Sequence, residues 1–162
     1  MVKTQGYSLM ELLLVVAILG ILSTMGARLM IQVNRYFQLT VARTDLQKEA
    51  RAAMYLISRN LRQAQAATII IDRAVGQPFY SRITFLKIQG GSVRYYQNGN
   101  QLVQTVDGRN QILTKNLRYL AFSFPRSDDL SIVSVSMTLE KATYQGKKKA
   151  LQMASERVRV MN

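Results

Sequence analysis

Residues 5–22 have the sequence QGYSLMELLLVVAILGIL, an apolar run with a single charged residue, Glu11. The run continues to Ala27, so the 21 residues from Tyr7 onward contain one charge. A helix needs about 20 apolar residues to cross the hydrocarbon core of a bilayer, and this segment is therefore predicted to span a membrane. A carboxylate in such a span costs roughly 2.5–3.5 kcal/mol at the helix centre and less near an end, so we expect Glu11 to have a function.

Two simpler explanations of this segment remain open. A secretory signal would use Lys3 as its positive start and residues 23–27 as its cleavage site, although a charge inside its apolar region is unusual. A plain membrane anchor fits the length of the segment but leaves Glu11 without a function.

The composition indicates a folded protein of modest size without the commonest catalytic and metal-binding side chains. The chain has 162 residues, of which 48% are hydrophobic and only two are proline, which argues against disorder. It contains no cysteine and no histidine, which excludes disulfides, thiolate metal sites and a histidine base. The formal net charge of +13 favours anionic partners such as nucleic acid, acidic lipid or acidic protein, without choosing among them.

The sequence lacks the patterns typical of catalytic and cofactor sites, so we expect a protein that is not an enzyme and holds no cofactor and no metal. Neither a phosphate-binding GxxxxGKS/T loop nor a GxSxG nucleophile elbow occurs. The pair Asp128-Asp129 follows a turn that contains a proline and lacks the roughly six oxygen ligands that calcium normally requires. A solvated turn is therefore favoured there over a metal site.

The apolar helix is predicted to continue as an amphipathic one. Apolar residues recur at helical spacing at Leu46, Ala50, Ala53, Met54, Ile57, Leu61 and Ala64, and the charged residues Lys48, Glu49, Arg51, Arg59 and Arg62 occupy the other faces. We interpret these charges mainly as a solvated face. An unbroken helix from Tyr7 to Ala67 would be about 90 Å long. The alternative is a second helix that starts at 44–47, where TDLQ resembles a capping box.

From Thr68 onward the periodicity changes toward two, which predicts strands. Candidate strands are 69–71, 82–88, 92–97, 102–106, 117–124, 132–139 and 151–160. Gly90-Gly91 and the NGN of 98–100 are hairpin signals because these residues accept positive φ at low cost. Residues 131–139 alternate apolar and small polar side chains, which is typical of a strand with one buried face. We expect the fold class to be α+β, with the long N-terminal helix packed on one face of an antiparallel meander.

The segment Gly6-Tyr7-Ser8-Leu9-Met10-Glu11, with the apolar run to Gly20, resembles the class III signal of type IV pilins and pseudopilins. The resemblance implies cleavage after Gly6 by a prepilin peptidase, methylation of the new amino group on Tyr7, and retention of the apolar helix. It also implies that Glu11 attracts the terminal amine of a neighbouring subunit, which would offset the desolvation cost of both charges. The chain departs from the family at Tyr7, where phenylalanine is most common, at Ser8, where threonine is usual, and in lacking a proline later in the helix.

A second resemblance concerns the strands. The VRYY of 93–96, Gly99, Leu102, the IL of 112–113, the run 117–124 and the final RVRVMN are similar to the sheet domain of W-type minor pilins and J-type minor pseudopilins of type II secretion. Together, the two resemblances imply a leader peptide at 1–6, a membrane and filament-core helix at 7–28, an amphipathic half at 29–67 and a sheet domain at 68–162. They imply a single-pass inner-membrane protein with a cytoplasmic N-terminus and the sheet domain outside. The implied partners are the prepilin peptidase, other major and minor subunits, and the inner-membrane assembly platform.

The positive charge also permits a function from another class, a DNA-binding minor pilin of a DNA-uptake pilus. Candidate contacts to a phosphate backbone are Lys147, Lys148, Lys149, Arg157 and Arg159. Tyr95 and Tyr96 are candidates for stacking on bases. The alternative for the lysine run is a charged hairpin edge that discourages wrong strand pairing. A third hypothesis is an anchored periplasmic protein unrelated to filaments.

Overall fold

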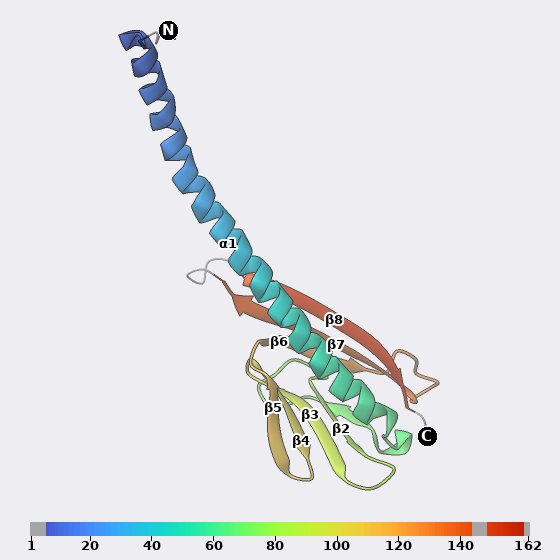
Figure 1. The fold of residues 1–162 in the computed structure, drawn as a ribbon. Helices are drawn as coiled ribbons and strands as arrows, with labels where there is room; N and C mark the ends of the chain where they lie inside the picture. Colours follow the sequence, from blue (N-terminus) through green and yellow to red (C-terminus); the bar gives the residue numbers. More distant parts are fainter. Residues whose placement is uncertain (1–5, 144–148, 161–162) are drawn as a thin grey trace. The chain divides into compact units, whose positions relative to one another are not determined.

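The computed structural model describes residues 6–143 and 149–160. The chain divides into two compact units, Met1–Gln38 and Leu39–Asn162. One helix, α1 (Leu9–Arg62), contributes to both units (Figure 1). The prediction of an unbroken helix is therefore confirmed, although α1 ends at Arg62 and not at Ala67. Thr44 lies inside the helix and donates its hydroxyl to Thr40 O at 3.0 Å, so it does not cap a second helix.

The first unit consists of the apolar part of α1. Every described residue before Leu39 is exposed, including Leu9 at 78% and Ile31 at 54%. By length and composition, α1 is one helix that could cross a membrane. Two hydroxyl groups of this part are satisfied by the helix backbone, because Ser23 Oγ donates to Leu19 O at 2.7 Å and Thr24 Oγ1 donates to Ile21 O at 2.8 Å. Such internal hydrogen bonds are what a segment in hydrocarbon requires.

In the second unit, α1 buries one stripe. Its buried apolar residues are Ala42, Leu46, Ala50, Ala53, Met54, Ile57 and Leu61. Apart from Ala42, these are the residues of the predicted stripe; its last member, Ala64, is buried as well but follows the end of the helix. Two turns and a short 3-10 helix, η1 (Ala66–Thr68), then lead into the strands.

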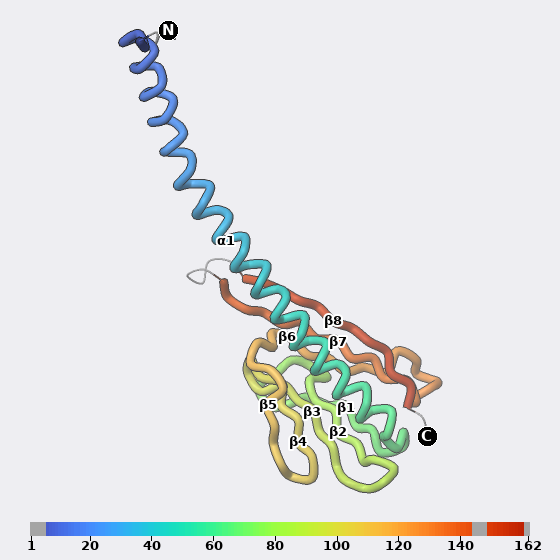
Figure 2. The backbone as a smooth tube through the Cα atoms, in the orientation of Figure 1, coloured from blue at the N-terminus to red at the C-terminus, as the bar shows by residue number. Residues whose placement is uncertain are grey.

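The strands form two antiparallel sheets, where the sequence predicted a single meander. The first sheet has the order β1-β2-β3-β4-β5 and the second β6-β7-β8. The strands are β1 (Ile70–Asp72), β2 (Arg82–Leu86), β3 (Ser92–Asn98), β4 (Gln101–Val106), β5 (Arg109–Thr114), β6 (Leu117–Ser123), β7 (Ile132–Ala142) and β8 (Lys149–Arg159). The tube in Figure 2 follows the chain from one sheet to the other at residues 115–116. There Asn116 N donates to Thr114 Oγ1 at 3.1 Å, and β6 pairs with β7 instead of continuing the first sheet.

The turns of the first sheet follow the predicted hairpin chemistry. Gly90 and Gly91, between β2 and β3, have φ of 85° and 96°, and Gly99, between β3 and β4, has φ of 58°. Asp107 and Gly108 join β4 to β5 with φ of 48° and 81°. Two consecutive positive φ angles suit a tight hairpin turn between twisted strands.

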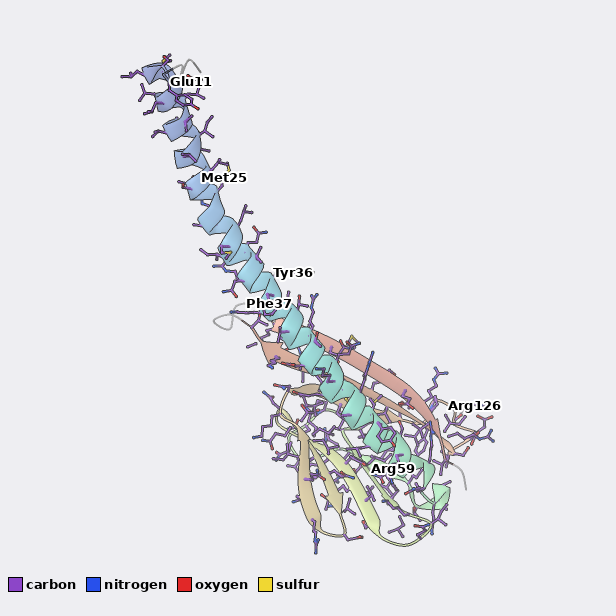
Figure 3. All side chains as sticks on the ribbon, in the orientation of Figure 1. Glu11, Met25, Tyr36, Phe37, Arg59 and Arg126 are labelled. Carbon is purple, nitrogen blue, oxygen red and sulfur yellow. The ribbon has the colours of Figure 1, made fainter. Side chains whose placement is uncertain are left out.

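The hydrophobic core lies between the second half of α1 and both sheets. Its largest fully buried side chains are Tyr95, Phe85, Phe122, Leu46, Ile57 and Leu61. In β7, Val133, Val135, Met137 and Leu139 are buried and alternate with half-buried neighbours, as the pattern of 131–139 predicts. Figure 3 draws the side chains of the described residues and shows those of the first half of α1 extending outward from the helix.

Candidate functional site

The predicted processing site lies just before α1. Gly6, Tyr7 and Ser8 precede the helix, which begins at Leu9, and all three are exposed, Tyr7 at 85%. A peptide bond outside regular structure is open to a protease, because no helix has to unwind before cleavage. The structure therefore places the Gly6–Tyr7 bond in an accessible segment next to the apolar helix.

Glu11 lies in the first turn of α1 (Figure 3). Ser8 N donates to Glu11 Oε2 at 3.4 Å, and Ser8 O accepts from Glu11 N at 3.0 Å and Leu12 N at 3.2 Å. This is half of a capping box, which the Ser8-x-x-Glu11 spacing signals and which our sequence analysis missed. A negative side chain at this position also complements the positive end of the helix dipole.

The cap leaves Glu11 free to bind a further group. The contact with Ser8 N is long for a hydrogen bond and engages one carboxylate oxygen, whereas a carboxylate offers about four lone-pair sites. No other charged residue lies between Tyr7 and Ala27. A cation that approaches Glu11 along this segment therefore meets a single negative charge on an apolar helix.

Of the five predicted phosphate contacts, the three that the structure describes are not gathered in one place. Lys147 and Lys148 lie outside the described residues. Lys149, at the start of β8, forms an ion pair with Glu140, which also accepts from Arg118 Nη1 at 2.6 Å. Lys149 first, and Arg118 second, hold the pKa of Glu140 below its usual range. Lys149 is therefore already engaged by a carboxylate.

Arg157 and Arg159 lie together near the end of β8, on either side of the buried Val158, and both are exposed. Along the strand, Arg157 is about 26 Å and Arg159 about 33 Å from Lys149. Tyr95 is 0% exposed in the core, so the prediction that it stacks on a base is wrong. The side chain of Tyr96, one residue later on β3, is half-buried.

Asp128 and Asp129, the acidic pair considered as a metal site, each bind a nearby residue of the same loop. Asp128 forms an ion pair with Arg126 Nη2 at 2.9 Å. Asp129 accepts from the hydroxyl of Ser131 at 2.5 Å and from its backbone N–H at 2.9 Å, and these two hydrogen bonds lower the pKa of Asp129. In residues 6–143 and 149–160, no group of three or more histidine, cysteine, aspartate or glutamate side chains is placed to hold a metal ion.

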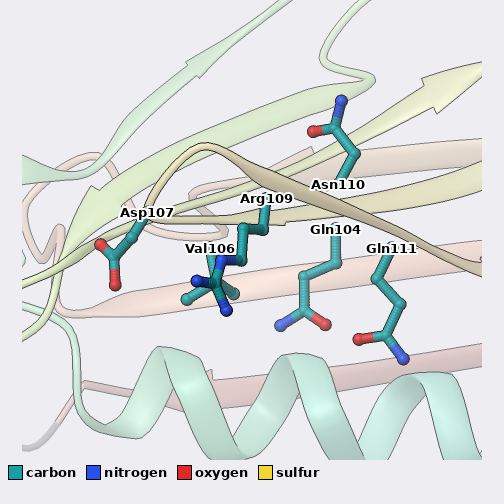
Figure 4. A pocket seen from close by; sticks show the side chains of 6 residues that line it. All are labelled: Gln104, Val106, Asp107, Arg109, Asn110 and Gln111. Atoms are coloured by element: carbon teal, nitrogen blue, oxygen red, sulfur yellow. The ribbon is translucent and has the colours of Figure 1, made fainter.

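A groove on the β4–β5 hairpin is lined by six residues, three of which carry amide side chains (Figure 4). Its volume is about 610 Å³, and its lining residues are Gln104, Val106, Asp107, Arg109, Asn110 and Gln111. Gln104 and Gln111 point to the same side of the hairpin, whereas Asn110 points to the other. Several of these groups are already bound: Gln104 Nε2 donates to Tyr95 OH at 3.0 Å, and Asp107 Oδ1 accepts from Ser92 N at 2.9 Å.

A second groove, of about 570 Å³, lies between the second half of α1 and β8. Its lining residues are Arg51, Met54, Tyr55, Ser58, Arg59, Arg62, Gln63 and Glu156. The helical spacing predicts that the three arginines lie opposite the apolar stripe, but no pattern in the sequence indicates that Glu156 of β8 lies beside them. Only the pairing of β8 with β7 and the packing of both under α1 bring this residue to the groove.

In comparisons with protein-family models, with curated proteins and with solved structures, no match to this chain was found, so a functional proposal for it rests on its own residues and geometry.

Proposed function

We propose that the chain is a non-catalytic minor pilin or pseudopilin, processed by a prepilin peptidase and assembled into a type IV pilus or a type II secretion pseudopilus. The observation that carries this proposal is the arrangement of residues 6–11. An exposed Gly6–Tyr7 bond directly precedes a fully exposed apolar helix whose first turn contains a single carboxylate, Glu11. A secretory signal or a plain anchor would not need that carboxylate.

The chemistry of assembly follows from the residues of this segment. Hydrolysis of the Gly6–Tyr7 bond creates an amino group on Tyr7, which is then methylated and stays positively charged near neutral pH. Glu11 of one subunit pairs with the amine of a neighbour as the apolar helices pack side by side. In a medium of low dielectric this pairing offsets the desolvation of both charges, and an unpaired Glu11 would disfavour insertion into the filament.

The second half of α1 and the sheets support the same proposal. The helix changes at Ala42 from fully exposed to amphipathic and packs its buried stripe against a compact sheet domain. Such a chain can hold a domain outside a membrane while its apolar helix lies within the inner membrane or the core of a filament. As a minor subunit it would help to start assembly at or near the tip, with the assembly platform and other subunits as partners.

The exposure of Arg157 and Arg159 supports a second candidate function, DNA binding by a minor pilin of an uptake pilus. Its test is the binding of duplex DNA by the full chain in nonionic detergent, measured across a series of salt concentrations. A steep salt dependence that Arg157→Glu/Arg159→Glu removes would favour this candidate. No binding at low salt would remove it.

The proposed processing is tested by coexpressing the full chain with a prepilin peptidase and determining its intact mass and N-terminal sequence. We expect a mature protein that begins at methylated Tyr7. Gly6→Val should block cleavage, whereas the control Gly20→Ala, with open space around the added methyl group, should be cleaved normally. An uncut wild-type chain, or one cut near Ala27, would refute the proposal.

A further inference from the structure

In its second half, α1 directs its two carboxylates toward the sheets. Asp45 Oδ2 pairs with Lys141 Nζ at 3.0 Å. Glu49 accepts from Thr114 Oγ1 at 2.7 Å and from Asn116 Nδ2 at 3.0 and 3.1 Å. Both acids are thus used to attach the helix to its own domain. The charges left on the outer face of this part of the helix are all positive.

Three of these positive charges line the groove between α1 and β8: Arg51, Arg59 and Arg62. All three are exposed, and none has a hydrogen bond or ion pair among the described residues. Arg51 and Arg59 are eight residues apart, which is about 12 Å along the helix axis. Tyr55 lies between them on the same face and is 65% exposed, so two cations flank an aromatic ring.

One carboxylate of β8, Glu156, also lines the groove. Of the nine carboxylates in the chain, it is the one without a hydrogen bond or ion pair among residues 6–143 and 149–160. A lone carboxylate beside three arginines opposes the approach of a phosphate backbone, which carries negative charge at every unit. A protein segment can avoid this carboxylate, or place a hydrogen-bond donor against it.

We propose that this groove is the docking site for an acidic segment of a different protein subunit. Arginine, tyrosine and methionine are enriched at the centres of protein interfaces, and the groove combines three arginines with Tyr55 and Met54. Its unpaired guanidinium groups present planar forks that suit carboxylates. This inference rests on the proposed function, because it names the chemistry of the neighbour that a minor subunit would contact in a filament.

A second copy of the chain is a poor occupant of the groove. Two copies each carry a formal net charge of +13 and repel one another. The carboxylates of a copy are mostly engaged within its own fold, so few remain to meet Arg51 and Arg59. Charge complementarity thus selects a partner that is acidic where this chain is basic, and it disfavours filaments made of this subunit alone.

The test uses the full chain in nonionic detergent and a fluorescein-labelled 18-residue helical peptide. The peptide carries leucines along one face and glutamates at every fourth position beside them, so that glutamates eight residues apart match the spacing of Arg51 and Arg59. Binding is measured by fluorescence anisotropy. The groove variant is Arg51→Glu/Arg59→Glu, and the matched control is Arg109→Glu/Lys115→Glu, two exposed cations of the β4–β5 region with the same change in net charge. Thermal unfolding by circular dichroism checks that both variants remain folded.

We expect the groove variant to bind the peptide about tenfold more weakly than the wild type, and the control to change the affinity less than about twofold. The same peptide with glutamine in place of glutamate should also bind about tenfold more weakly. Equal losses in the two variants, or equal binding of the two peptides, would overturn the proposal. Binding of a 30-residue oligothymidylate that depends on Arg51 and Arg59, without such dependence for the peptide, would assign the groove to nucleic acid instead.

The same samples are treated with prepilin peptidase, so that the two proposals can fail separately. Cleavage after Gly6 together with peptide binding that does not depend on the groove would overturn the docking site and leave the filament proposal standing. Absence of cleavage in the wild type would overturn the filament proposal, and with it the identification of the acidic partner as a filament subunit.

Discussion

Removing the hydroxyl of Tyr95 should weaken the attachment of α1 to the first sheet. This hydroxyl lies at a point where three elements meet. It accepts from Asn60 Nδ2 of α1 at 2.5 Å and from Gln104 Nε2 of β4 at 3.0 Å, and it donates to Leu56 O of α1 at 3.3 Å. Tyr95 itself belongs to β3 and is 0% exposed. The change Tyr95→Phe keeps the ring and removes all three hydrogen bonds.

The magnitude follows from the groups left behind. A buried donor without a partner costs about 1–3 kcal/mol. Asn60 is 8% exposed and should bear such a cost in full, because no other hydrogen bond of its amide nitrogen is found among the described residues. Gln104 is also buried, at 6% exposed, but it lines the β4–β5 groove, so its amide can turn toward water there and bears a smaller share of the cost. We therefore expect Tyr95→Phe to lower the free energy of unfolding by about 2–4 kcal/mol.

The assay is urea-induced unfolding of the full chain in nonionic detergent, followed by near-ultraviolet circular dichroism. The matched control is Tyr119→Phe, at a tyrosine that is 42% exposed, for which we expect a change below about 0.5 kcal/mol. In an Asn60→Ala background, Tyr95→Phe should cost less, because one of the stranded donors is already gone. Similar free energies of unfolding for Tyr95→Phe and Tyr119→Phe would refute the reasoning.

Three further predictions concern pH, a second polar contact and assembly. Burial raises the pKa of Tyr95 to about 12, whereas the unfolded chain should titrate near 10. Because the pKa is higher in the folded state, this contribution to the free energy of unfolding is complete below about pH 10. Between about pH 10 and pH 12 about 3 kcal/mol of it is lost. Unfolding of the wild type and of Tyr95→Phe, compared across this pH range, checks the prediction. Glu49→Ala should cost about 1–3 kcal/mol in the same urea assay because Thr114 and Asn116 lose their acceptor, and a change below about 0.5 kcal/mol would contradict this. Glu11→Ala should still be processed and inserted in the membrane but should not be recovered in sheared filaments, and normal incorporation would rule out the ion-pair mechanism.

The helix and most strands were predictable because their signals are local. The buried stripe of α1 depends on the 3.6-residue period, and the alternation in 131–139 depends on the pleat of a strand. The division of the strands into two sheets was not predictable in this way. A period of two is the same whether a strand pairs within one sheet or starts another, and the outcome depends on the turn at residues 115–116, where Asn116 is held by Glu49.

The candidate sites show the same limit. Glu11 stands out in the sequence because a lone charge in an apolar run is visible without a structure. Its bond with Ser8 N was also encoded locally, in the four-residue spacing of a capping box. Tyr95, by contrast, looks like an accessible aromatic beside basic residues, and only the packing of α1 on β3 shows that its ring is buried. Glu156 and Arg51 are about a hundred positions apart in the chain, and they line the same groove only because β8 packs beside α1.

Because residues 9–38 expose an apolar surface, the stability of the helix in this segment depends on its surroundings as well as on the chain itself. None of the side chains of this segment is buried by the rest of the protein, and helices in proteins are stabilised mostly by packing. A medium that binds the folded helix, such as hydrocarbon, detergent or neighbouring helices, stabilises it by mass action. The temperature at which this segment melts should therefore change with the kind and amount of that medium. The sheet domain, whose core is enclosed by its own residues, should melt at nearly the same temperature in all of them.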